Sequence, residues 1–268
     1  MIREITIGQY YQADSAIHRM DPRTKIVGTI AFIVSLFLAN NCIGYLVAAT
    51  FLVTVIKISK VPFRFMVRGM KSVVFLLLIT VIFNLFLTPG TVLVKFWKLT
   101  ITEEGLRQAV YMAVRLTFLI LGSSLMTLTT TPNNLTDGLE KLLSPLKIIR
   151  VPVHEVAMMM SIALRFIPIL LDETDKIMKA QIARGADFET GNLIKKAKNM
   201  VPLLVPLFIS AFRRASDLAM AMEARCYRGG KYRTKMKPLK YRRRDVVAYL
   251  VMVAYIVVIV LTKQIDIF

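Results

Sequence analysis

The segment at residues 26–56 constrains the fold of this chain more than any other, because it contains no charged side chain. A single straight helix of this length would be roughly 46 Å long, whereas the hydrocarbon core of a bilayer is about 30 Å thick. Asn40 and Asn41 form a turn signal at the centre of the segment. We expect two short membrane-embedded helices, completed at their ends by the snorkelling side chains of Lys25 and Lys57, and a re-entrant hairpin fits almost equally well.

Three further apolar segments predict membrane-spanning helices: residues 72–87, 104–131 and 246–262. Between the first two, residues 92–99 have a strand-like or interfacial pattern that contains the only tryptophan, Trp97. The predicted fold class is therefore all-α, a polytopic membrane protein with about five transmembrane helices.

The charge distribution gives these segments a direction across the membrane. The chain has 36 Lys and Arg against 17 Asp and Glu, a net charge of +19, although 56% of its residues are hydrophobic. Most of the basic residues fall in segments 1–25, 57–71 and 132–245. Because basic loops stay in the cytoplasm, we expect the N-terminus inside and the C-terminus outside. No nucleic-acid-binding module accompanies the charge, so no nucleic acid partner is expected.

Residues 132–244 have neither a lipid-spanning pattern nor that of an ordinary soluble domain. Two stretches, residues 153–184 and 193–227, each combine an apolar part with a charged end, which is typical of long amphipathic helices at a membrane surface. A shorter amphipathic helix is expected at residues 135–146. Three prolines are expected to bend the two long helices: Pro168, Pro202 and Pro206.

The two long stretches share the pattern Ala-x-x-Ala-Arg, at residues 180–184 and 221–225. On a helix, both alanines and the arginine of each copy lie on one face. The small alanines let another surface approach closely, and the arginine offers five donors to a carboxylate or a group of carbonyls. The repetition predicts two similar soluble partners. A simpler reading stays open, because an arginine at a helix end also favours the helix dipole without any partner.

Two more motifs accompany this pattern. Residues 20–25 read Met-Asp-Pro-Arg-Thr-Lys before the first predicted span, and residues 164–168 read Leu-Arg-Phe-Ile-Pro. Over nearly its whole length the chain resembles the transmembrane coupling components of energy-coupling factor (ECF) transporters, the EcfT family. The resemblance implies a non-catalytic subunit without a cofactor, in the plasma membrane of a prokaryote. It would couple two ABC-type ATPase subunits to a small membrane-embedded substrate-binding subunit for uptake of a vitamin or a metal ion.

The resemblance also implies where the partners bind. Each ATPase would hold one three-residue motif in a groove: Ala183, Arg184 and Gly185 for one, and Ala224, Arg225 and Cys226 for the other. Cys226 departs from the family pattern, in which glycine is common at this position. The pair Gly229-Gly230 is therefore expected to supply the helix stop.

The expected organisation has three parts. Residues 1–131 form a membrane domain with four spans, residues 132–244 form cytoplasmic coupling helices, and residues 245–268 form the final transmembrane helix. The basic run at residues 231–244 is expected to lie against anionic lipid headgroups.

Other polar residues carry weaker expectations. Arg115 lies inside a predicted span, where we expect it to snorkel outward or to pair with Glu103 or Glu104, although an intramembrane charge is also a candidate functional group. Three acidic residues on the first long helix are expected to form a solvated face and not a metal site: Asp172, Glu173 and Asp175.

Two alternative functions stay open beside the coupling subunit. A stand-alone permease needs polar groups near the bilayer midplane, and only Asn84 and Arg115 are obvious candidates. A membrane-embedded lipid-linked transferase needs clustered carboxylates around a divalent metal, whereas the predicted spans contain no acidic residue except Glu104 at an edge. No phosphate-binding loop is present in the sequence, so ATP hydrolysis is expected of the partners.

Overall fold

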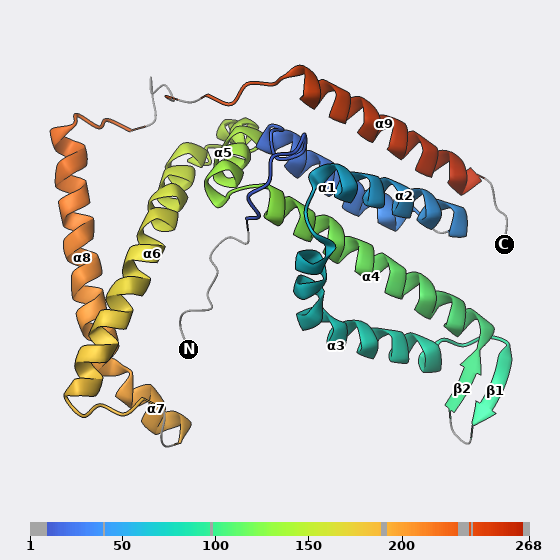
Figure 1. Ribbon diagram of the computed structural model, residues 1–268, viewed down its shortest axis with the longest axis horizontal. Coiled ribbons are helices and arrows are strands. Elements are labelled where there is room, and N and C mark those ends of the chain that lie inside the picture. Colours follow the sequence, from blue (N-terminus) through green and yellow to red (C-terminus); the bar gives the residue numbers. More distant parts are fainter. Residues whose placement is uncertain are drawn as a thin grey trace. The chain divides into compact units, whose positions relative to one another are not determined.

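The computed structural model describes residues 10–39, 41–96, 99–188, 192–229, 236 and 238–264. Within these ranges the chain is helical apart from one two-stranded β-hairpin, so the predicted all-α class is confirmed (Figure 1). The elements in chain order are α1 Pro22–Leu38, α2 Cys42–Ser59, α3 Phe63–Leu87, β1 Val92–Phe96, β2 Leu99–Thr102, α4 Glu103–Thr129, α5 Pro132–Leu142, the 3-10 helix η2 Ser144–Ile149, α6 Val153–Ala183, α7 Leu193–Asn199, α8 Val201–Ala224 and α9 Arg243–Gln264.

The contacts divide the chain into two compact units. The core unit comprises Gly8–Lys141 and Leu239–Phe268, and the arm unit contains Leu142–Pro238. Within the described residues, four helices are long and apolar enough to cross a membrane, namely α2, α4, α6 and α9, and Val73–Phe86 within α3 is a shorter apolar helix. The sequence did not predict α6 as a span, because its second half is polar.

The uncharged segment at residues 26–56 folds as the two predicted helices, α1 and α2. Asp21 caps α1, since its carboxylate accepts from the backbone N–H of Arg23 at 2.9 Å, and Pro22 occupies the first turn. The chain is extended at Ala39 and at Asn41, between the two helices. The turn signal therefore marked the correct break, but α1 begins four residues before the apolar run because the cap lies at Asp21.

α3 starts nine residues earlier than predicted, directly after Pro62. The basic residues at 64 and 68 thus belong to a helix, not to a loop. The hairpin that follows confirms the strand-like pattern, with β1 antiparallel to β2 and Phe96 opposite Leu99. Trp97 lies outside the described residues. The hydroxyl of Thr102 then caps α4 by accepting from the N–H of Gly105 at 3.1 Å.

α5 starts at Pro132 instead of the predicted residue 135. The Thr131 hydroxyl accepts from the N–H of Asn134 at 3.3 Å, so Thr131 and Pro132 begin a helix as well as ending the preceding one. The predicted single helix at 193–227 is instead α7 and α8, which meet at Met200. Pro202 in the first turn of α8 explains the division, because proline is tolerated at a helix start and disfavoured inside one.

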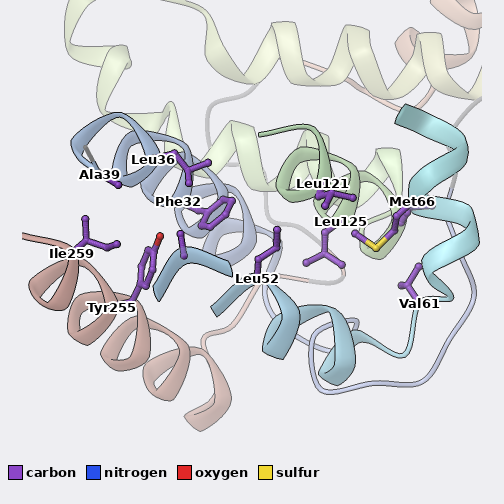
Figure 2. Close-up of a cluster of buried hydrophobic side chains, with 12 residues drawn as sticks. Phe32, Leu36, Ala39, Leu52, Val61, Met66, Leu121, Leu125, Tyr255 and Ile259 are labelled. Carbon is purple, nitrogen blue, oxygen red and sulfur yellow. The ribbon is translucent and has the colours of Figure 1, made fainter. Parts of the chain in front are cut away.

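The hydrophobic cluster of the core unit lies among α1, α2, α4 and α9, and it extends to Met66 at the start of α3 and to Val61 just before that helix (Figure 2). The rings of Phe51 and Tyr255 stack with centroids 4.3 Å apart, and the Tyr255 hydroxyl shares a 2.8 Å hydrogen bond with the Ser35 hydroxyl. A Cβ atom at Gly122 would come within 2.8 Å of the Phe32 ring, so α4 can approach α1 this closely only with glycine there. This packing sets the positions of the four helix ends described below.

Candidate partner-docking site

The first Ala-Arg motif forms the C-terminal end of α6. Ala183 is the last helical residue, Arg184 is the C-cap, and Gly185 has a left-handed φ of +87°. The N–H of Gly185 donates to the carbonyl of Ile182 at 2.9 Å, and the N–H of Ala186 donates to the carbonyl of Gln181 at 3.0 Å. These two bonds define a Schellman motif, which satisfies the last carbonyls of the helix and ends it at the arginine.

The second motif ends α8 in the same way. The N–H of Cys226 donates to the carbonyl of Glu223 at 2.8 Å, and that of Tyr227 donates to the carbonyl of Met222 at 3.0 Å. Cys226 itself takes the left-handed position, with a φ of +56°. The expectation that Gly229-Gly230 supplies the stop is therefore wrong, because the helix has already ended at Cys226; Gly230 lies outside the described residues.

All six predicted contact residues are exposed to solvent. Neither Arg184 nor Arg225 forms an ion pair or a side-chain hydrogen bond with a described residue, and both occupy the C-cap of a helix of more than 20 residues. A positive charge is favourable at that end of a helix. The small alanine side chains beside each arginine leave the guanidinium open to a partner surface.

α6 and α8 are joined as an antiparallel pair by polar contacts between them. Glu173 on α6 accepts a hydrogen bond from the hydroxyl of Ser210 on α8. It also forms an ion pair with the guanidinium of Arg214 on α8, at 2.8 Å. Closer to the first motif, the side-chain amide of Gln181 donates to the carbonyl of Pro202 at 3.4 Å. The expectation of a wholly solvated acidic face is thus wrong at Glu173, although Asp172 is exposed.

This pairing places the two motifs at opposite ends of α8. The first lies beside the start of α8 through Gln181, and the second closes its end, as the ribbon of the arm unit shows (Figure 1). A helix of 24 residues is about 36 Å long. One partner surface of ordinary size therefore cannot cover both motifs with a single groove.

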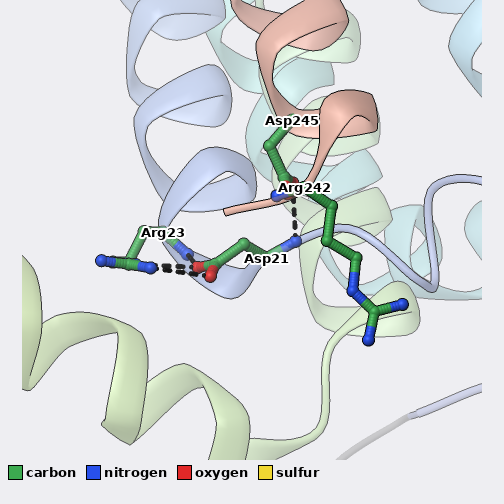
Figure 3. Close-up of polar contacts among 4 residues, drawn as sticks. All are labelled: Asp21, Arg23, Arg242 and Asp245. Atoms are coloured by element: carbon green, nitrogen blue, oxygen red, sulfur yellow. Dashed lines mark hydrogen bonds and ion pairs between the residues drawn. The ribbon is translucent and has the colours of Figure 1, made fainter. Parts of the chain in front are cut away.

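The Met-Asp-Pro-Arg-Thr-Lys motif forms a polar centre in the core unit (Figure 3). Arg23 binds the Asp21 carboxylate in a bidentate pair, at 2.9 and 3.0 Å, and its guanidinium lies 3.8 Å from the centroid of the Tyr241 ring. Burial raises the pKa of Asp21, but the bonds from Arg23 outweigh it, so the pKa lies below its ordinary value of 3.8. The motif begins α1 and contacts the segment that leads into α9.

Sequence reasoning missed Asp245, the acid that completes this centre. Its carboxylate accepts from the backbone N–H of Asp21 and from that of Arg242, each at 2.8 Å, and only 2% of the residue is exposed. An aspartate after a basic run and before an apolar helix is a helix-start signal, which could have identified it. Asp245 thereby ties the beginning of α1 to the beginning of α9.

Lys25 does not snorkel as predicted. Its ammonium group donates to the carbonyl of Thr129 at 2.8 Å and to that of His18 at 3.3 Å.

Arg115 does not pair with Glu103 or Glu104 either. Its Nε donates to the Tyr45 hydroxyl at 2.9 Å, while Glu104 accepts from the backbone N–H of Thr91.

No metal site is evident in the part of the chain that the structure describes, since no group of three or more His, Cys, Asp or Glu side chains could hold an ion there. Of the basic run at residues 231–244, only Met236 and residues 238–244 lie within the described ranges. Both cysteines, Cys42 and Cys226, are exposed free thiols.

Comparisons with known proteins agree on one family. The family model described as CbiQ, cobalt transport protein, matches residues 13–236. Three bacterial relatives carry the name energy-coupling factor transporter transmembrane protein EcfT. The protein of Clostridium kluyveri is 57% identical over 265 residues, covering 98% of this chain and 98% of the relative. That of Thermosediminibacter oceani is 55% identical, covering 93% and 94%, and that of Bacillus subtilis is 46% identical, covering 91% and 93%.

The resemblance stated from the sequence is thereby confirmed, and the membrane-capable helices fit the transmembrane role that the relatives' name gives. The chain belongs to the CbiQ/EcfT family and is a multi-pass cell-membrane protein, the transmembrane component of an ECF transporter complex.

Proposed function

We propose that the chain is a non-catalytic coupling subunit of an ATP-driven importer. It binds one ABC-type ATPase subunit at Ala183, Arg184 and Gly185 and a second at Ala224, Arg225 and Cys226. Motion of the ATPases passes through α6 and α8 to a small membrane-embedded subunit that binds the substrate, a vitamin or a metal ion. ATP hydrolysis belongs to the partners.

One observation carries this proposal: the same exposed helix end occurs twice. Each copy ends in a Schellman motif, presents an arginine without an acidic partner among the described residues, and lies about one α8 length from the other. Two similar partners can therefore bind by the same contact without competing for space.

The proposed topology places these helix ends in the cytoplasm. Residues 1–131 and 245–268 form the membrane part, with the N-terminus inside, and residues 132–244 form the cytoplasmic coupling helices. The structure supports this alternation within the core unit, because one cavity is lined by the start of α1, the end of α2, the end of α4 and the start of α9. Successive crossings that begin inside bring these four ends to the same side.

The test reverses the charge of both arginines in the intact complex. Arg184→Glu combined with Arg225→Glu should release both ATPases during purification in detergent while the chain stays inserted. Losing one partner of a desolvated charge pair costs roughly 2–5 kcal/mol, so ATPase recovery should fall at least about tenfold. Each single variant should retain one ATPase.

The matched control changes two neighbouring exposed basic residues by the same charge, Lys179→Glu with Arg228→Glu. This control should retain both ATPases, since neither residue belongs to a motif. Undiminished ATPase recovery with the arginine double variant, or equal loss in the control, would show that the motifs are not the docking points.

A further inference from the structure

An apolar cavity of about 320 Å³ lies in the core unit where four helix ends meet. This volume lies within the range of small-molecule sites, roughly 300–1,000 Å³. The lining comes from all four helices and is almost entirely hydrocarbon, for example Gly28, Phe32, Leu52, Val55, Leu125 and Met252. Several of these side chains also belong to the hydrophobic cluster in Figure 2.

The cavity opens on one face of α9. Val247 and Val251 line it and are nevertheless 58% and 51% exposed, so they form its rim on the outside of the unit. Exposed aliphatic side chains on membrane-capable helices face lipid, so the opening is accessible to a molecule from the bilayer.

A second, polar cavity of about 390 Å³ adjoins the first, and Ala16 lines both. Three basic side chains and one acid line it: Arg19, Lys60, Arg244 and Asp14. Arg19 forms a bidentate ion pair with Asp14. Lys60 and Arg244 line the same cavity, and the pKa of Asp14 is lowered chiefly by its bond from Arg19 and further by these two charges.

This second cavity therefore has two positive charges that its acid does not balance. Asp14 is already paired with Arg19, and neither Lys60 nor Arg244 forms an ion pair with any residue in the described ranges. Lys25, which lines the apolar cavity, is held by two backbone carbonyls. Basic pockets beside membrane helices bind anionic lipid headgroups, and each basic side chain there strengthens binding about fivefold.

We propose that the two adjoining cavities hold one anionic phospholipid, with an acyl chain in the apolar cavity and its phosphate at Lys60 and Arg244. The paired cavities match an amphipathic ligand, whereas a free phosphate would fill only the polar one. Burial of each methylene group adds to binding, so the chain and the headgroup both contribute. The site is separate from both Ala-Arg motifs and does not depend on the proposed ATPase contacts.

The experiment titrates the purified full-length chain with phosphatidylglycerol or with phosphatidylcholine and counts bound lipids by native mass spectrometry. Wild type should hold one phosphatidylglycerol at least about tenfold more tightly than phosphatidylcholine. Lys60→Asn with Arg244→Gln should weaken phosphatidylglycerol about 30-fold and leave phosphatidylcholine unchanged. Asparagine is chosen because Lys60 has a left-handed φ of +57°, which asparagine tolerates.

A matched control removes one lysine and one arginine charge beside the site, by Lys57→Asn with Arg243→Gln. This control should keep the preference for phosphatidylglycerol over phosphatidylcholine. Ala248→Phe fills the apolar cavity and should weaken both lipids. Millimolar inorganic phosphate should leave the bound lipid in place. Equal affinity of wild type for the two lipids, equal loss in the control, or displacement of the lipid by inorganic phosphate would each overturn the proposal.

Discussion

Cys226 ends α8 in the same left-handed backbone position in which Gly185 ends α6, with φ values of +56° and +87°. Both residues donate to the third carbonyl before them, and both follow an arginine C-cap. The geometry of the helix end is therefore shared although the residue differs. A side chain in this region costs conformational energy that glycine avoids.

This difference predicts opposite effects of two substitutions. Cys226→Gly should stabilise the end of α8 by about 1 kcal/mol, and Gly185→Ala should destabilise the end of α6 by a similar amount. No other group lies within 4 Å of a Cβ added at Gly185, so the cost there is conformational, not steric. Hydrogen exchange of the last turn of each helix measures both effects. Faster exchange in Cys226→Gly would contradict the assigned backbone position.

The ion pair between Glu173 and Arg214 predicts a modest effect on the pairing of α6 with α8. Glu173→Gln removes the charge but keeps an acceptor for the Ser210 hydroxyl. Because the two side chains are 22% and 39% exposed, the loss should be no more than about 1 kcal/mol, and Glu173→Ala should cost more. Hydrogen exchange along the middle of α8 reports the loosening.

The control for this prediction is Asp172→Asn, which neutralises the exposed neighbouring acid. Exchange in α8 should then match wild type. If exchange in Glu173→Gln also matches wild type, the ion pair contributes nothing and the pairing of the helices depends on apolar packing.

Asp245 predicts a larger effect on the core unit. Asp245→Ala leaves the N–H groups of Asp21 and Arg242 without their buried acceptor, and each unsatisfied group costs about 1–3 kcal/mol. Asp245→Asn keeps one carbonyl acceptor and should fall between the alanine variant and wild type. Thermal unfolding of the purified chain in detergent should follow this order. A melting temperature of Asp245→Ala equal to that of wild type would show that the link from α1 to α9 contributes nothing.

His18 predicts a dependence of stability on pH. Burial lowers its pKa below the ordinary 6.5, the bond to the Tyr11 carbonyl opposes this, and the charge of Lys25 adds to the lowering. The Tyr11 carbonyl can only accept, at 3.0 Å, so Nε2 donates and Nδ1 accepts from the Ser15 hydroxyl at 2.7 Å. Protonation makes Nδ1 a donor, so the Ser15 hydroxyl has to turn from donor to acceptor while the partly buried ring gains a charge.

Since the folded pKa is the lower one, the stabilisation by neutral His18 is present above pH 6.5 and is lost as pH falls through the folded pKa. The melting temperature of wild type should therefore drop between pH 7 and pH 5. His18→Asn should show a smaller drop over the same range. An identical drop in both proteins would assign the effect to other groups.

Much of the fold follows from local patterns in the sequence. The turn at Asn41 is predictable because polar residues interrupt an otherwise uncharged run, and the ends of the apolar helices follow from hydropathy. Helix starts were predicted less well. α3 and α5 both begin earlier than expected, directly after Pro62 and at Pro132, since proline fits at a helix start without losing a hydrogen bond.

The polar contacts were less predictable because their partners are distant in sequence. Asp21 meets Asp245 across more than 200 residues, and Arg115 finds Tyr45 instead of the nearby acids at the start of its own helix. Charge and spacing identify which side chains need a partner, but only the packing of α1, α2, α4 and α9 decides which partner is within reach. The Ala-Arg motifs were identifiable because their geometry is local.

The contact of Glu173 with Ser210 lies between the two arginines along the helix pair. From it to Arg184 along α6 is about 17 Å, and to Arg225 along α8 about 22 Å in the opposite direction. A rotation of only about 10° about this contact would move each arginine by roughly 3–4 Å, on the order of one helical half-turn. Small changes in the crossing angle of these two helices would therefore correspond to larger displacements of the two arginines.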